Sequence, residues 1–111
     1  MSYQNEKFRG NGSIKNDSVY SASSTAQVVM AESVSRRVLS IQNIGNGKVY
    51  VRFGAAPVVS GTKLFSYILA PSSGTENGDG GVLTLDGYTG SVYVATTGSE
   101  TSTVIATDFN N

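Results

Sequence analysis

The feature that most constrains the fold is a series of short segments in which apolar and polar residues alternate, separated by glycine-rich turns. Arg36–Asn43 reads RRVLSIQN, and residues 48–53 read KVYVRF. A period of two is typical of a β-strand with one buried face. The turn Gly45-Asn46-Gly47 separates the two segments, and Asn-Gly adopts positive φ at little cost. We therefore expect the two segments to form a β-hairpin.

Shorter β-prone runs continue this pattern along the chain. We expect further strands at Gln27–Met30 and at residues 63–69, 82–85, 91–96 and 103–109. No window of about a dozen residues has helical periodicity. The sequence therefore predicts an all-β fold, an antiparallel β-sandwich of jelly-roll or immunoglobulin-like topology. An immunoglobulin domain in the strict sense is disfavoured, because the chain has no Cys and no Trp.

The first 25 residues differ from the rest. They are rich in Ser, Asn, Gly and charge, and their apolar residues have no regular spacing. Such a segment cannot bury enough apolar surface to offset its chain entropy, so an inert disordered tail is one interpretation. Its aromatic residues favour the other, an extended N-terminal arm (1–25) that orders against a neighbour, ahead of a β-sandwich domain (26–111). The predicted partner-binding residues of the arm are Tyr3, Phe8, Arg9, Ile14 and Tyr20.

Charge is unevenly distributed although the net charge is zero. The first 70 residues hold all eight basic side chains and three acidic ones, a net charge of +5, and the remainder carries −5. In one interpretation the two parts neutralise each other within a single fold. In the other, a basic edge and an acidic edge let copies associate or dock on a charged partner.

Several basic residues lie on the predicted hairpin, and we predict partner binding by Arg36, Arg37, Tyr50 and Arg52. Basic side chains interleaved with aromatic ones can hold single-stranded nucleic acid. This patch is small and the acidic part of the chain would oppose it, so we expect no nucleic-acid partner. An acidic protein partner is one alternative, and protection of an exposed strand edge against aggregation is another.

The remaining aromatic residues divide between the core and a partner-facing side. Tyrosine suits interfaces, because it offers a large contact area and a hydroxyl group. By default we place Phe53, Phe65 and Phe109 in the core, and Tyr50, Tyr67, Tyr88 and Tyr93 on the opposite side.

Catalytic chemistry has few candidate residues in this chain. Without Cys or His there is no disulfide, zinc finger, cysteine nucleophile or Ser-His-Asp triad. Glu76 and Asp79 form a close acidic pair, but they lie in a glycine-rich loop that is a poor scaffold for a glycosidase or for a twelve-residue calcium site. No phosphate-binding glycine motif is present. We expect no enzyme activity, no cofactor, no metal and no small-molecule substrate.

Targeting signals are not recognisable. The opening MSYQNEKFRG has neither the basic region nor the apolar region of a signal peptide. Apolar runs are far shorter than the roughly 18 residues that a membrane span requires. We therefore expect a protein made in the cytoplasm with no membrane partner.

Three stretches resemble a known group of proteins. RRVLSIQNIGNGKVYVRFG (residues 36–54), GTKL (61–64) and YTGSVYVAT (88–96) are similar to small β-structured virion proteins of tailed bacteriophages. In that group a basic pair opens a strand reading roughly LxIQN, and strands reading YVRFG and YTGxVY follow. The resemblance covers about 75 residues downstream of the arm, and its motifs are strand and turn patterns rather than catalytic signatures.

The resemblance implies a structural component of the virion, most simply a capsid decoration (cement) protein on the head surface. Its partners would be the major capsid protein and neighbouring copies of itself, with a trimer as one arrangement. Two other classes stay open. One is a tail or head-fibre accessory module that binds a host-surface glycan or receptor, and the other is a small hydrolase using Glu76 and Asp79.

Overall fold

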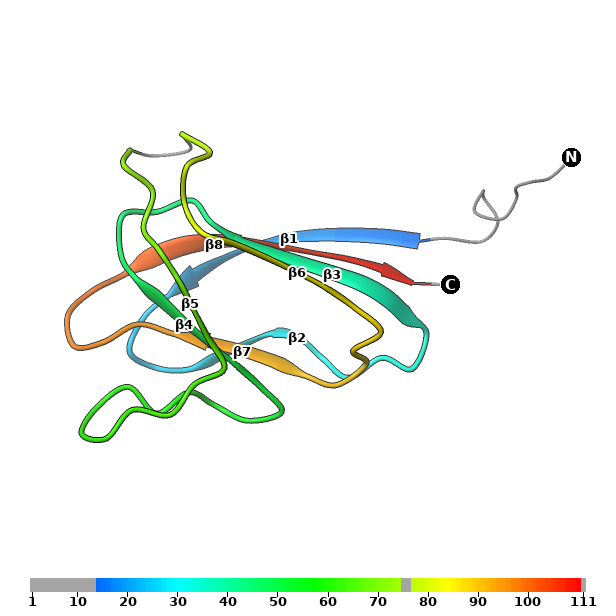
Figure 1. The fold of residues 1–111 in the computed structure, drawn as a ribbon, viewed down its shortest axis with the longest axis horizontal. Helices are drawn as coiled ribbons and strands as arrows, with labels where there is room; N and C mark the ends of the chain where they lie inside the picture. The colour runs from blue at the N-terminus through cyan, green and yellow to red at the C-terminus, as the bar shows by residue number, and fades with distance from the viewer. Residues whose placement is uncertain (1–13, 75–76, 111) are drawn as a thin grey trace, which may run out of the picture.

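The computed structural model describes residues 14–74 and 77–110, and in them the fold is all-β. Two four-stranded antiparallel sheets pack face to face (Figure 1), which confirms the predicted sandwich. The strands are β1 (Ile14–Ala22), β2 (Gln27–Met30), β3 (Arg36–Asn43), β4 (Val49–Phe53), β5 (Tyr67–Leu69), β6 (Val82–Asp86), β7 (Val92–Ala95) and β8 (Ser102–Asn110). None of these residues belongs to a helix that is long and apolar enough to cross a membrane.

The order of the strands is that of a jelly roll. Sheet A has the order β1-β8-β3-β6, and sheet B has the order β2-β7-β4-β5. The antiparallel pairs β1–β8, β2–β7, β3–β6 and β4–β5 are what results when one long hairpin, with β1 to β4 in one arm and β5 to β8 in the other, is rolled into two layers. Of the two topologies that the sequence left open, the jelly roll is therefore the one observed.

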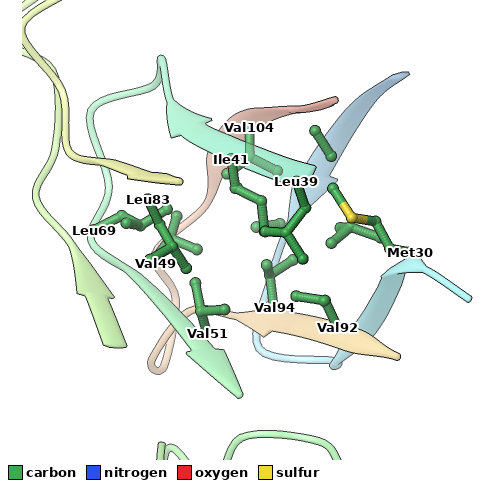
Figure 2. Packing of buried hydrophobic residues seen from close by; sticks show 13 residues of the cluster. Met30, Leu39, Ile41, Val49, Val51, Leu69, Leu83, Val92, Val94 and Val104 are labelled. Atoms are coloured by element: carbon green, nitrogen blue, oxygen red, sulfur yellow. The ribbon is translucent and has the colours of Figure 1, made fainter. Parts of the chain in front are cut away.

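The core lies between the inner faces of the two sheets. Aliphatic side chains from both sheets point toward one another there (Figure 2), and most of them are β-branched, which suits a pleated surface. Leu39 and Ile41 of β3 face Val51 and Val94 of sheet B, and all four are completely buried. The alternation in Arg36–Asn43 therefore sets the buried face of β3 as predicted.

The predicted hairpin between β3 and β4 does not form, because the two strands lie in different sheets. The turn at residues 45–47 is present, but it carries the chain from sheet A to sheet B. The buried side chain of Asn43 holds this crossing: its Nδ2 donates to the carbonyl oxygens of Gly47 (2.7 Å) and Leu69 (3.1 Å). Its Oδ1 accepts from the Oγ of Ser102 (2.6 Å). Gly45 and Gly47 do not have positive φ, so both the turn conformation and the strand pairing expected from this sequence were wrong.

Part of the predicted arm belongs to the sandwich. Ile14–Ala22 forms β1, the edge strand of sheet A, and pairs along its whole length with β8 of the same chain. Pairing with β8 provides hydrogen-bond partners for the backbone of this polar segment. The buried Ala22 and the half-buried Tyr20 face the core. The boundary of the sandwich therefore lies at or before Ile14 rather than after residue 25. Residues 1–13 lie outside the described part of the chain.

Candidate interaction surfaces

Of the five partner-binding residues predicted in the first 20 residues, the structure describes Ile14 and Tyr20. Tyr3, Phe8 and Arg9 lie outside the described residues. The backbone of Ile14 begins β1 opposite Asn110. Tyr20 is half-buried and packs against the hydrophobic core, so most of its ring serves the domain itself.

Arg36 is a structural residue, and its interpretation as a partner-binding residue is wrong. Its side chain is only 1% exposed, and its Nε lies 3.2 Å from Oδ2 of Asp108. Its terminal nitrogens donate to the carbonyl oxygens of Gly90 (2.7 Å) and Ala31 (2.5 Å). The guanidinium thus ties β8 to the β2–β3 and β6–β7 connections, because five fixed donors can hold several acceptors at once. This ion pair also joins the basic and acidic parts of the chain within one fold.

The outer side of sheet B is partly covered by the β4–β5 connection, residues 54–66 (Figure 1). Phe65 of this connection packs edge-on against Tyr50, with ring centroids 5.1 Å apart. Tyr50 is therefore only 5% exposed and is not the partner-facing residue that we expected. Arg52 is half-buried and donates to the carbonyl oxygen of Ala56 (3.1 Å), which fixes the same connection. Arg37, by contrast, is exposed.

The other aromatic predictions divide in the same way. Phe53 and Phe65 are half-buried, and Phe53 packs against the core, whereas Phe109 is 38% exposed on the outer side of sheet A. Its placement in the core is therefore wrong, because the period of two along β8 directs it outward. Tyr88 packs against Phe53, with ring centroids 4.9 Å apart, so it also serves the domain.

Residues 58–68 contain four exposed apolar side chains. Val58, Leu64, Tyr67 and Ile68 are each more than 40% exposed. Tyr67 pairs with the inward-facing Val51 and Ile68 pairs with the outward-facing Tyr50, so these two side chains point to opposite sides of β5.

We call the bridge partners Val58 and Leu64 the β4–β5 patch. Val58 and Leu64 are paired by backbone hydrogen bonds in both directions, and the ring of Tyr67 packs edge-on against Phe53. These contacts fix the backbone of the patch while leaving Leu64, for example, 51% exposed. Only Tyr67 had been expected to face outward. Val58 lies outside every strand that the sequence predicts, whereas Leu64 lies within the strand expected at residues 63–69, so no sequence signal marks the pair.

An open groove lies between the start of β1 and the β2–β3 connection. Its volume is about 470 Å³, and Asn16, Ser18 and Tyr20 of β1 form one wall. Glu32 and Ser33 contribute to the opposite wall. We call it the β1–β2 groove. It is open because the short strand β2 does not cover the first half of β1, where the polar Asn16 and Ser18 face inward.

The acidic loop after β5 is organised by Asp79. Its Oδ1 accepts hydrogen bonds from the Oγ of Ser72 (2.9 Å) and the backbone N–H of Ser73 (3.0 Å). Hydrogen bonds from Ser73 and Ser72 lower the pKa of Asp79 to about 2. A general acid needs the opposite shift, toward neutral pH. Glu76 lies outside the described residues, and within residues 14–74 and 77–110 no group of three or more acidic side chains is placed to hold a metal ion.

Comparisons with known proteins identify a fold but no family. The sequence matches no protein family and no curated protein. A solved structure described as Bacillus endospore appendages that form a family of disulfide-linked pili is similar in fold, with a TM-score of 0.52 and 20% identity. The match covers 89% of this chain and 86% of that one. This chain contains no Cys, so it lacks the residues for disulfide linkage. At this level of identity, the comparison supports the sandwich fold and nothing more specific.

Proposed function

We propose that this chain is a structural component of a tailed-bacteriophage virion, a capsid decoration protein that binds and stabilises the assembled head. The observation that carries the proposal is the β4–β5 patch, an apolar surface held in place by backbone pairing. Exposed apolar clusters of this kind are typical of protein interaction sites. The phage-like stretches coincide with β3, β4 and β7, and the stretch at residues 61–64 lies in the β4–β5 connection and includes Leu64 of the patch.

A decoration protein works by contact rather than by chemistry. Each copy would bury the β4–β5 patch against the major capsid protein, with the exposed Lys63 at its border. Many weak contacts repeated over a lattice give a large collective stabilisation.

Co-sedimentation with heads purified without this protein tests the proposal. Leu64→Asp should weaken head binding at least about tenfold, because a charge would replace an apolar contact. Val34→Asp is the matched control, since Val34 is 89% exposed and lies in the β2–β3 connection outside the patch. Wild-type protein that fails to bind heads, or equal binding by the two variants, would rule the proposal out.

The arm hypothesis needs a shorter deletion than residues 1–25, because that deletion would remove β1. Removing residues 1–13 leaves all described strands intact. If the arm binds a neighbouring chain, this truncated protein should keep its melting temperature and lose head binding. Retention of full head binding would contradict a role for Tyr3, Phe8 and Arg9.

The β1–β2 groove favours a second candidate, an accessory module that binds a host-surface glycan. Polar side chains beside a tyrosine ring are suited to hydrogen-bonding and stacking with a sugar. This candidate predicts glycan binding by the isolated protein that is lost in Ser18→Trp, which would fill the groove. It also predicts that Leu64→Asp leaves glycan binding intact.

A further inference from the structure

The outer face of sheet A carries residues in three rows that run across the four strands. Leu39 and Ile41 are buried between the sheets, so the residues that alternate with them point outward. The register of the sheet then defines each row in the order β1, β8, β3, β6. The first row is Lys15, Phe109, Val38 and Asp86; the middle row is Asp17, Thr107, Ser40 and Thr84; the third row is Val19, Ile105, Gln42 and Val82.

Large apolar side chains are exposed on this face. Val19 is 66% exposed and Val82 is 60% exposed, at the two ends of the third row. The middle row is polar, and Thr107 there donates from its Oγ1 to Oδ1 of Asp17 (2.7 Å). The face therefore combines a largely apolar third row, a middle row of three hydroxyl residues and Asp17, and a first row in which two apolar residues lie between two charged ones.

The first row ends in opposite charges, with Lys15 on the edge strand β1 and Asp86 on the edge strand β6. The face is thereby complementary to itself. Consider a two-fold axis that is parallel to the strands and lies midway between two such sheets. It places each row of one copy opposite the same row of the second copy, with the order of the strands reversed. Lys15 then faces Asp86 of the second copy, and Val19 faces Val82 of the second copy.

We propose that the outer face of sheet A pairs with the same face of a second copy of this chain about this two-fold axis. An isologous contact of this kind needs a self-complementary surface, which the three rows provide. Sheets that pack face to face lie about 10 Å apart, a gap that an extended lysine and an aspartate can bridge. Lys15 lies 3.2 Å from Asp17 in the single chain, so the second carboxylate adds to an existing ion pair.

The charges favour this axis over the other two-fold axis that lies in the plane midway between the two sheets. A two-fold axis perpendicular to the strands would place the first row over the third. Lys15 would then face Val19, and Asp86 would face Val82. Lys15 would keep Asp17 of its own chain, but Asp86 would lose water without gaining a cation from the second copy.

The size of the face sets the strength of the pairing. Four strands about 4.8 Å apart, with strands of up to nine residues at about 3.3 Å each, present about 500 Å² per copy. The total of about 1,000 Å² lies at the lower limit for a specific interface. We therefore expect a weak dimer that forms as concentration rises, and this expectation does not depend on the proposed function.

Sedimentation equilibrium of the full chain, from about 1 μM to about 1 mM, measures this dimer. Val82→Lys should weaken dimerisation at least about tenfold, because it places a charge opposite Val19 of the second copy. Val34→Lys, the same change outside this face, should leave the dissociation constant unchanged. A monomer or a trimer over the whole range, or equal effects of the two variants, would overturn the proposal.

A charge swap tests the orientation of the two copies. Lys15→Glu should weaken the dimer, and the double variant Lys15→Glu/Asp86→Lys should restore it, because each charge meets its opposite again across the two-fold axis. Melting temperatures of both variants separate loss of pairing from loss of fold. A folded double variant that pairs no better than Lys15→Glu would refute this axis.

Discussion

Arg36 offers the sharpest test of how this sandwich is held together. Arg36→Ala would remove the guanidinium that joins Asp108 to the carbonyl oxygens of Ala31 and Gly90. Asp108 would remain beside the core without its counter-charge, and both carbonyl groups would lose a charged donor. Arg36 itself is almost completely buried, whereas Ala31 and Asp108 also line the open β1–β2 groove, so water reaches part of this network.

The expected loss follows from these contacts. Removing one member of a buried ion pair costs about 3–5 kcal/mol. We expect about 3 kcal/mol, because the Asp108 side chain is 14% exposed and keeps a hydrogen bond from Asn16 (3.3 Å). For a domain of this size 1 kcal/mol lowers the melting temperature by about 4–8 °C, so the midpoint should fall by about 12 °C or more.

Thermal and urea unfolding, followed by circular dichroism, would measure this loss. Arg37→Ala is the matched control, because the neighbouring side chain is exposed, and its effect should stay within about 0.5 kcal/mol. In an Asp108→Asn background the same Arg36→Ala change should cost less, since no carboxylate is left unpaired. If Arg36→Ala destabilises no more than Arg37→Ala, the role assigned to this ion pair is wrong.

Two further predictions concern Gly78, Asp79 and Gly80, which lie in the loop between β5 and β6. A Cβ at residue 80 would lie 1.9 Å from the carbonyl oxygen of Asn43, so Gly80→Ala should destabilise by about 1–3 kcal/mol in urea unfolding. Gly78→Asn, at a φ of +81° with open space around it, should cost less than about 1 kcal/mol; equal costs would contradict the packing argument. Because the pKa of Asp79 falls from 3.8 to about 2 on folding, its ionised form stabilises the fold above pH 4, and this contribution is lost as the pH falls through 2. The difference in melting temperature between wild type and Asp79→Asn should therefore shrink between about pH 4 and pH 2, and a constant difference would refute it.

The sequence predicted those strands whose inward residues reach the core. β2 and β3 were placed with their correct bounds, and in β3 Leu39 and Ile41 alternate with polar residues. β1 was not predicted, because Asn16 and Ser18, which face inward, line the β1–β2 groove instead of the core. Their polarity hides the period of two on which the prediction of a strand depends.

Contacts between distant residues explain the errors at the predicted sites. No local pattern indicates that Arg36 is buried against Asp108, which lies 72 residues away. In the same way, Tyr50 is covered by Phe65 from a connection that has no regular structure of its own. Residue type and strand position predicted an exposed cation and an exposed ring, whereas tertiary packing buried both.

The position of β8 in sheet A has a consequence for how the protein is made. β8 lies between β1 and β3, yet it is the last of the eight described strands to leave the ribosome. Until it emerges, β1 has no partner in sheet A, and one edge of β3 stays open. Pairing of segments so far apart in sequence is slow, and unpaired edges of this kind promote aggregation. Sheet A can therefore close only after β8 has been made, and the yield of soluble protein during expression depends on how quickly β8 inserts between its two neighbours.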